Sequence, residues 1–303
     1  DGEISLLDGE IDFNFKVVLN NSKKYLLKIS RSSFEQEYID YQVLLLEHLN
    51  KNSKIELPKL VLSTDNKKSS IIQDGHGYDR SVRLMSWIDG RLWSSVNPIT
   101  KSLRYELGYL CSELSKSLQD FKHPYAGKEI EWDVAKSLWV ENYLDKFDHE
   151  KIKILKKFIK NFKDNLHLYQ KLEKSIIHND INDNNIIVTN DFLNPSVKAV
   201  IDFGDSVFSQ TINDLAITCS YGIMNLNDPL SGCIDILKGY NQNRKVKDNE
   251  LKLLYNLIAM RLVISVTKSS INKYKEPGNK YLLISEKSAW NLLNKWRDRK
   301  SVV

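Results

Sequence analysis

The sequence predicts an α+β fold of two lobes, a small antiparallel sheet lobe followed by a larger, mainly helical lobe. Over residues 1–85 the apolar side chains alternate with polar ones or form short runs between turn-forming residues, which is typical of strands. After Asp89 and Gly90 the apolar side chains recur with the helical period instead. We therefore expect one domain over residues 1–86 and a second over residues 87–303, with a ligand cleft between them.

The small lobe is expected to contain short strands around one helix. Residues 11–19 and 24–29 alternate roughly, and the turn-forming Asn-Asn-Ser at 20–22 joins them into a hairpin. Residues 34–49 follow with tyrosines and leucines at helical spacing, which predicts a helix. The remaining apolar runs predict strands at 59–62, 69–73 and 82–88.

The large lobe is expected to be helical apart from one strand pair. Leucines recur every three or four positions over residues 100–121, which places them on one face of a helix. Short apolar runs at 185–188 and 197–201 predict two strands joined by a polar loop. Similar helical patterns occur at 134–147, 151–171, 214–224, 234–240, 249–270 and 281–297.

Composition narrows the class of protein. The 303 residues are 42% hydrophobic and 27% charged, which is ordinary for a globular chain and argues against disorder. The net charge of +5 comes largely from lysines that punctuate the apolar residues of one helix, so we interpret them as its solvated face. Basic residues do not cluster with aromatic or base-reading partners, so no nucleic-acid partner is expected.

Cysteine usage and hydropathy indicate the compartment. Cys111, Cys219 and Cys233 are widely spaced and form no metal-binding pattern, so we expect buried, free thiols in a reducing environment. No apolar run approaches the roughly 20 residues needed to cross a bilayer, and the first residues lack a secretory pattern. We therefore expect a cytoplasmic protein without membrane contact. The sequence gives no indication of oligomeric state.

Two short motifs indicate the chemistry. The run His-Asn-Asp-Ile-Asn-Asp-Asn-Asn at 178–185 places Asp180 five positions before Asn185. Asp202 then begins an Asp-Phe-Gly triplet. This order and spacing are typical of phosphoryl-transfer sites of the kinase type. Because the predicted strand pair connects the two motifs, Asn185 and Asp202 should lie side by side.

Each residue of these motifs has an expected role. Asp180 is the candidate catalytic base, which would orient a substrate hydroxyl and accept its proton. Asn185 and Asp202 are candidate ligands of Mg²⁺, which needs few protein oxygens when phosphates and water supply the others. A turn role is plausible for Asn185 alone, and the downstream Asp202 favours the metal role. His178 is expected to anchor the loop by hydrogen bonding.

Lys28 is the candidate contact to the α- and β-phosphates of ATP or GTP, because it lies near the end of a strand beside the expected cleft. A lysine in this role needs a carboxylate on the following helix. Asp40 and Glu37 can both serve, while Gln42 occupies nearby register, so the partner stays open.

The other residues of the nucleotide site are predicted only from where they lie relative to the expected strands and the joint between the lobes. Ser86 and Ile88 lie at the joint between the lobes, where backbone groups can bond to the base. The phosphate-covering loop should fall within residues 7–15. This segment contains a single glycine and lacks the Gly-x-Gly-x-x-Gly pattern.

Together these residues resemble the aminoglycoside phosphotransferase and choline kinase-like superfamily, which consists of small-molecule kinases with a protein-kinase-like fold. The likeness extends over nearly the whole chain and is carried by residues 82–91, 178–185, 200–205 and 213–216. Within the superfamily the chain is most similar to the hydroxylysine kinase branch, which also occurs as a domain in class III aminotransferase fusions. The segments that carry this finer likeness are 121–124, 131–133, 181–185, 201–205 and 213–217.

The chain departs from the family pattern at two positions. Asn179 stands where glycine is usual, and asparagine tolerates the backbone angles that glycine adopts. Gln42 stands where many relatives carry the acidic partner of the lysine.

The resemblance implies Mg²⁺-dependent transfer of the γ-phosphate of ATP or GTP to an alcohol on a small, amine-bearing molecule. Hydroxylysine, homoserine, an amino alcohol and an aminoglycoside are the expected kinds of acceptor. An ammonium group requires carboxylates or aromatic faces nearby. The candidates for that contact are Asp205, Glu131, Asp133, Trp132 and Trp139. Alternatively, the two tryptophans pack in the hydrophobic core.

Two other functions remain to be weighed. A protein kinase is disfavoured, because the chain lacks the Arg of His-Arg-Asp and the Ala-Pro-Glu motif, and it leaves no room for an activation segment after Asp202. A non-catalytic nucleotide-binding module is the other alternative. The retained Asp180, Asn185 and Lys28 argue against it.

Overall fold

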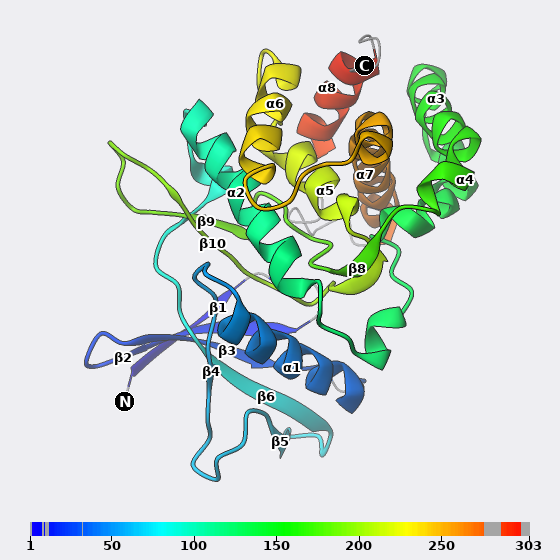
Figure 1. Ribbon diagram of the computed structural model, residues 1–303. Coiled ribbons are helices and arrows are strands. Elements are labelled where there is room, and N and C mark those ends of the chain that lie inside the picture. Colours follow the sequence, from blue (N-terminus) through cyan, green and yellow to red (C-terminus); the bar gives the residue numbers. More distant parts are fainter. Residues whose placement is uncertain (1, 8, 10–11, 32, 276–285, 298–303) are drawn as a thin grey trace.

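The computed structural model describes residues 2–7, 9, 12–31, 33–275 and 286–297. It has a sheet lobe below and a helical lobe above, which confirms the predicted fold class (Figure 1). The division at residues 86 and 87 stays a prediction, although the last long strand of the sheet lobe does end at Ser86.

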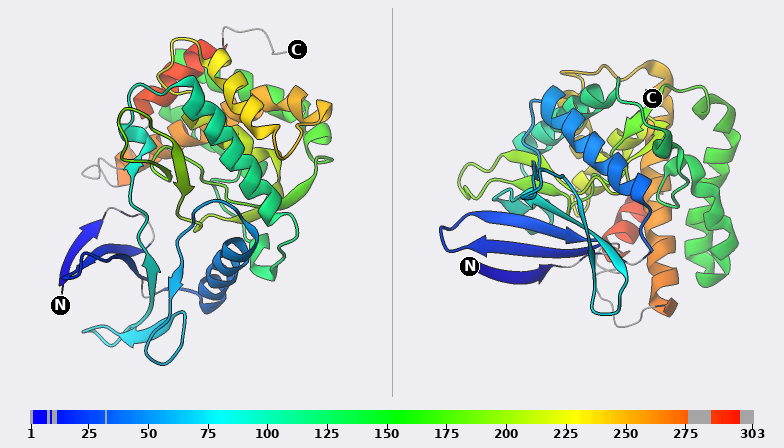
Figure 2. Two further views of the ribbon diagram at one scale, coloured as in Figure 1. Left: turned by 60° about the vertical axis from the view of Figure 1, so that its left-hand side comes forward. Right: turned by 90° about the horizontal axis from the view of Figure 1, so that it is seen from below.

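The sheet lobe is a six-stranded antiparallel sheet with one helix packed against it (Figures 1 and 2). Its strand order is β1-β2-β3-β6-β4, and β5 pairs with the other part of β6. The sequence missed β1, because five of its six residues are exposed and it carries no buried alternating face. The elements are β1 (Gly2–Leu7), β2 (Phe13–Leu19), β3 (Lys24–Ile29), α1 (Gln36–Asn52), β4 (Leu60–Val61), β5 (Ser70–Gln73) and β6 (Asp79–Ser86).

The helical lobe is built around two helix pairs, α2 with α6 and α5 with α7. Gly108 of α2 and Gly239 of α6 lie where these two helices meet. A Cβ added at Gly239 would lie 1.8 Å from the Tyr105 carbonyl oxygen, so only glycine permits this approach. The helices are α2 (Lys101–Leu118), α3 (His149–Asp164), α4 (Leu166–Tyr169), α5 (Ile212–Gly222), α6 (Pro229–Tyr240), α7 (Asp248–Lys275) and α8 (Glu286–Arg297).

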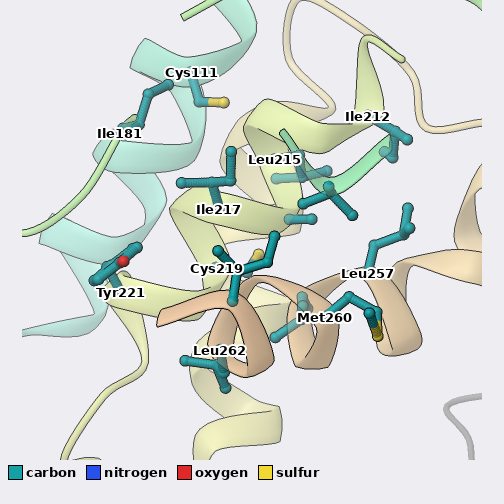
Figure 3. Packing of buried hydrophobic residues seen from close by; sticks show 14 of the residues in the cluster. Cys111, Ile181, Ile212, Leu215, Ile217, Cys219, Tyr221, Leu257, Met260 and Leu262 are labelled. Atoms are coloured by element: carbon teal, nitrogen blue, oxygen red, sulfur yellow. The ribbon is translucent and has the colours of Figure 1, made fainter. Parts of the chain in front are cut away.

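Figure 3 shows the centre of this lobe, where apolar side chains of α5 and α7 pack against each other and against α2. Ile217, Met260 and Leu262 are fully buried there, so both helices are held rigidly. The three cysteines are also buried and free, as expected. None of the helices in the described ranges is apolar over a stretch long enough to cross a bilayer.

The helical lobe contains more strands than the single pair that was predicted. That pair is present as β9 (Ile186–Val188) and β10 (Val197–Val200), and β7 (Arg91–Leu92) pairs with β9. A separate ladder joins β8 (Lys174–Ile177) to β11 (Val207–Gln210). Both strands of this ladder are short and largely buried, so they lack the alternation that identifies a strand in a sequence.

The other differences from prediction lie in the helices. The stretch expected as one helix at 151–171 is divided into α3 and α4, and the segment expected as an α-helix at 134–147 is 3₁₀-helical, η3 (Val134–Lys146). Of the helix expected at 281–297, residues 281–285 lie outside the described residues. Two shorter 3₁₀ segments are η1 (Trp93–Ser95) and η2 (Pro124–Gly127).

Candidate active site

A cleft of about 560 Å³ lies between the two lobes. Lys28 and Ser86 line it from the sheet lobe, and Asp180, Asn185 and Asp202 line it from the helical lobe. The sequence motifs are thus brought together in one cavity. Cavities of this size at a boundary between lobes are the usual binding sites for small ligands.

The loop that carries Asp180 is anchored from beneath by Asp214 at the start of α5. The two carboxylate oxygens of Asp214 accept hydrogen bonds from the backbone N–H groups of His178 and Asn179, at 2.9 and 2.8 Å. Burial raises the pKa of Asp214, while the two backbone donors oppose that rise. Asn179 has a φ of +66°, the left-handed conformation in which glycine is usual, so asparagine fills this position as expected.

His178 is a structural residue here. Its Nδ1 accepts a hydrogen bond from the backbone N–H of Asp180 at 3.2 Å, so this nitrogen carries no proton. Its Nε2 lies 3.1 Å from the carbonyl oxygen of Ile201 and must be the donor there. The ring is fully buried and fixed in one tautomer, so it joins the Asp180 loop to the strand before Asp202.

Asp180 is held by three side chains. Asn182 and Asn185 donate from their amide nitrogens to its carboxylate, and Asn185 does so at 2.7 Å. The third donor is Nη2 of Arg261, which lies 2.7 Å from Oδ1 of Asp180. Since Nδ2 of Asn185 also bonds to the Asp180 carbonyl, its Oδ1 is the atom available to a cation.

Asp202 faces the same space from the other side. Its φ of +62° is unusual for a residue with a side chain, and strained backbone of this kind is concentrated at functional sites. Its Oδ1 lies 3.3 Å from Nζ of Lys28, and this lysine is the main cause of the lowered pKa of Asp202. The carboxylate is therefore ionised at neutral pH, and 48% of its side chain is exposed to the cleft.

The expected ion pair between Lys28 and Asp40 does not form. Asp40 is exposed on α1 and accepts a hydrogen bond from Gln36 at 2.8 Å. Gln42 lines the cleft, and side chains two positions apart on a helix point about 200° apart. Asp40 therefore faces solvent. Glu37 is exposed as well.

Asp12 supplies the missing carboxylate, which sequence reasoning did not find. Lys28 on β3 lies directly opposite Arg83 on β6, so two cations share one face of the sheet. The Asp12 carboxylate lies between them, with Oδ2 3.0 Å from Nη2 of Arg83 and 3.7 Å from Nζ of Lys28. Gln42 accepts a further hydrogen bond from Nη1 of Arg83. The sequence suggested that Lys28 pairs with one carboxylate on the helix. Instead, Lys28 shares Asp12 with Arg83, and Gln42 on the helix bonds to Arg83.

The remaining nucleotide-site predictions fall on the rim of the cleft. The N–H of Ser86 donates to the Lys59 carbonyl at 2.8 Å and that of Trp87 to the Lys24 carbonyl at 3.3 Å. Ile88 lines the cleft, and its backbone forms no such bond with the residues that the structure describes, so its contact with the base stays a prediction. Leu7, Gly9 and Asn14 line the cleft, whereas residues 8, 10 and 11 of the expected covering loop lie outside the described residues.

The five acceptor-site candidates separate into two that line the cleft and three that do not. Asp205 and Trp132 line the cleft, and the Asp205 carboxylate forms no hydrogen bond with the residues that the structure describes. Burial, then the carboxylates of Asp180 and Asp202, raise the pKa of Asp205 to about 7.

The other three candidates point elsewhere. Asp133 is buried and accepts hydrogen bonds from Ser209 at 2.7 Å and from the N–H of Ala135 at 3.0 Å, so it caps η3 and is not an acceptor contact. Glu131 does not line the cleft and forms an ion pair with Lys268 at its edge. The indole of Trp139 donates to the Glu131 carbonyl at 2.9 Å.

Arg261 is the most informative residue that the motifs did not reveal. It is 1% exposed, bonds to Asp180 and donates from Nη1 to the Trp132 carbonyl at 2.9 Å. Its guanidinium carbon lies 4.6 Å from the Trp132 ring. A lone arginine within the apolar run of α7 was the available signal, because a buried charge requires a partner.

The donor set fits Mg²⁺. Asn185 Oδ1 and the Asp202 carboxylate are hard oxygen ligands, and together they leave most of the octahedral positions to phosphate and water. The described residues contain no group of three or more His, Cys, Asp or Glu side chains suited to a metal.

Comparison with known proteins places the chain in a family. A family model described as "Phosphotransferase enzyme family" matches residues 3–232. The chain is 26% identical to the hydroxylysine kinase of Mus musculus, with 95% of this chain and 82% of that protein covered. It is 24% identical to the hydroxylysine kinase of Xenopus laevis, with 92% and 79% covered.

Two solved structures have the same fold. A microcompartment-associated aminopropanol kinase has a TM-score of 0.75 at 15% identity, covering 98% of this chain and 92% of that one. An amicoumacin kinase in complex with AMP-PNP, Ca²⁺ and Ami has a TM-score of 0.71 at 16% identity, covering 96% of this chain and 88% of that one.

Proposed function

The chain belongs to the phosphotransferase enzyme family and is a small-molecule kinase, and from this premise we propose that it phosphorylates a hydroxyl group of a small, amine-bearing molecule. The phosphate donor is ATP or GTP. The observation that carries the proposal is the convergence of Asp180, Asn185, Asp202 and Lys28 on one cleft between the lobes.

Asp180 acts as the base. The acceptor hydroxyl donates a hydrogen bond to its carboxylate, and the hydroxyl oxygen attacks the γ-phosphorus in line with the leaving group. The bond between the γ-phosphorus and the bridging oxygen breaks, and the nucleoside diphosphate leaves with the electron pair. Asp180 takes the hydroxyl proton late in this step, since phosphoryl transfer depends mostly on positioning and charge neutralisation.

Cations on the sheet lobe neutralise the phosphates. Lys28 is the direct phosphate contact, and Asp12 fixes its position together with that of Arg83. Gln42 on α1 is neutral, so it offsets less of the positive charge of Arg83 than a glutamate would. A triphosphate entering the cleft therefore meets two cations and one carboxylate on this side.

Asn185 and Asp202 hold Mg²⁺ in this proposal. When bound, the metal supplies charge neutralisation and orients the phosphates. Asn185 also donates to Asp180, so the same side chain links the base to the metal ligands. The amicoumacin kinase complex with AMP-PNP and Ca²⁺ supports a nucleotide with a divalent cation in this fold.

Asp205 is placed to bind the ammonium group of the acceptor. It lines the cleft near Asp180, and its carboxylate is left without a hydrogen-bond donor by the described residues. The relatives named hydroxylysine kinases make hydroxylysine the first acceptor to examine. Homoserine, amino alcohols and aminoglycosides are the other classes.

A screen of these acceptors with ATP and with GTP tests the proposal. We expect Mg²⁺-dependent formation of nucleoside diphosphate that requires an acceptor and is nearly abolished by Asp180→Asn. Nucleotide binding without transfer to any acceptor at any Mg²⁺ concentration would instead identify a non-catalytic module.

A further inference from the structure

One face of α7 forms a polar wall of the cleft. Residues spaced three or four positions apart lie on the same side of a helix. The buried residues of α7 are mostly apolar, and this polar stripe lies where the helix lines the cleft. The residues that line the cleft are Arg261, Ser265, Lys268, Ser269 and Asn272, two of them cationic and none acidic.

Arg261 and Lys268 differ in whether their hydrogen-bond donors are available to a ligand. Arg261 is occupied by Asp180 and by the Trp132 carbonyl. Nζ of Lys268 lies 6.0 Å from the Trp132 ring and 5.5 Å from the Trp139 ring, and its side chain is 20% exposed. Its ion-pair partner is Glu131, whose side chain is 62% exposed. Such an exposed partner is weakly held, so Lys268 can donate to a ligand.

Two neighbours on the same face also have unused donors. Ser265 is only 4% exposed, and its hydroxyl has no hydrogen-bond partner among the residues that the structure describes. The amide of Asn272 has none there either, and this residue is half-buried in the cleft wall. Donors that line a cleft without a protein partner can bond to a ligand that enters it.

We propose that Lys268, with Ser265 and Asn272, binds a carboxylate of the acceptor, so that the enzyme acts on a hydroxy amino acid. This inference rests on the proposed function, because it names the acceptor of the same site. An ammonium, a hydroxyl and an amide all donate hydrogen bonds, which is what a carboxylate requires.

The placement of the two cations fits a zwitterionic acceptor. Arg261, which bonds to the catalytic base, and Lys268 both lie near the Trp132 ring, so the base and the proposed carboxylate site are close to each other in the cleft. Asp205 near the base suits an ammonium group. Aminoglycosides and amino alcohols lack a carboxylate, so either would leave the donors of Lys268, Ser265 and Asn272 without an acceptor.

Matched substrates test the proposal. 5-Hydroxylysine is compared with 1,5-diaminopentan-2-ol, which lacks only the carboxylate, and homoserine is compared with 3-aminopropan-1-ol. We expect wild-type kcat/KM to be at least about tenfold higher for the amino acid that is the true acceptor than for its decarboxylated partner. Lys268→Met should raise KM for the amino acid about tenfold to a hundredfold, with little change in kcat and none in KM for the amine.

Three variants serve as controls. Glu131→Gln breaks the same ion pair but keeps the cation, so it should not raise KM for the amino acid. Lys273→Met removes a lysine of the same helix that pairs with Glu286 outside the cleft, and it should leave both substrates unaffected. Lys268→Arg should restore most of the affinity.

Several results would overturn the inference. Equal kcat/KM for the members of each pair would do so, and so would equal losses in Lys268→Met and Glu131→Gln. If no acceptor is phosphorylated, the proposed function fails, and calorimetry with 5-hydroxylysine and AMP-PNP then decides the inference separately. Binding that requires both the carboxylate and Lys268 would support it, and binding unaffected by Lys268→Met would contradict it.

Discussion

Replacing Arg261 with methionine removes the guanidinium that bonds to the catalytic carboxylate while it keeps a side chain of similar length. Arg261 donates to Asp180 at 2.7 Å and to the Trp132 carbonyl at 2.9 Å, and it is 1% exposed. The substitution therefore has two separable consequences. One is a less well-positioned base, and the other is a less stable helical lobe.

The magnitudes follow from these contacts. A hydrogen bond between charged groups contributes about 1.5–3 kcal/mol, which corresponds to a fall in kcat of about tenfold to 150-fold if it acts on the chemical step. Removing one partner of a buried pair destabilises by about 3–5 kcal/mol. Asp180 is 23% exposed and keeps its bonds to Asn182 and Asn185, so about 2–3 kcal/mol is expected here. For a chain of 303 residues each kcal/mol corresponds to about 1.6 °C, so Tm should fall by about 3–5 °C.

Arg104→Met is the matched control. Arg104 also donates to one carboxylate, Asp235 at 2.9 Å, and to one backbone carbonyl, that of Ile99 at 2.7 Å. Its side chain is 13% exposed, and it does not line the cleft. This variant should lose a similar amount of stability and keep the wild-type kcat.

The assay couples release of nucleoside diphosphate to a spectroscopic signal at about 20 °C, well below either transition, with thermal unfolding followed by circular dichroism. A kcat for Arg261→Met within twofold of wild type would refute the positioning role. Equal losses of kcat in the two arginine variants would show that stability alone explains the effect.

Three further predictions concern the loop and the charges around it. Asp180→Asn should lower kcat by about a hundredfold to ten-thousandfold, with nucleotide affinity unchanged by calorimetry; a weakened affinity would place Asp180 in binding instead. Asp214→Asn replaces an acceptor of a buried backbone N–H with an amide group, and it should destabilise by about 2–4 kcal/mol in urea unfolding; an unchanged midpoint would contradict the anchoring role. Because the folded-state pKa of Asp205 is raised to about 7 from an unfolded value near 3.8, its contribution to stability is present below pH 4 and is lost as the pH rises through 7. In the absence of metal, the Asp205→Asn variant should therefore become more stable relative to wild type as the pH rises from 4 to 7.5. A stability difference independent of pH would contradict the raised pKa of Asp205.

The parts of the site that sequence could predict are those joined by short stretches of chain. Asp180 and Asn185 share one loop, and Asn185 and Asp202 are connected by the hairpin of β9 and β10. Lys28 was placed because it lies on a strand with a clear pattern. In each of these cases local spacing determines the geometry.

Contacts that depend on the packing of distant segments could not be predicted. Arg261 is 81 residues from Asp180 and meets it only because α7 passes behind the catalytic loop. Asp12 becomes the partner of Lys28 because the β3–β6 register places Arg83 opposite that lysine. Asp133 follows the cleft residue Trp132 directly in the sequence. Its side chain caps η3, however, and is therefore buried in the core. Register and capping geometry decide these positions, and a single sequence does not reveal them.

Locating Mn²⁺ by anomalous scattering in crystals of the protein with AMP-PNP tests the central claim most directly. The predicted result is a metal about 2.1 Å from Oδ1 of Asn185 and from the Asp202 carboxylate, with the γ-phosphate facing Asp180. A metal bound elsewhere, or a triphosphate that does not reach the space between Asp180 and Asp202, would contradict the account.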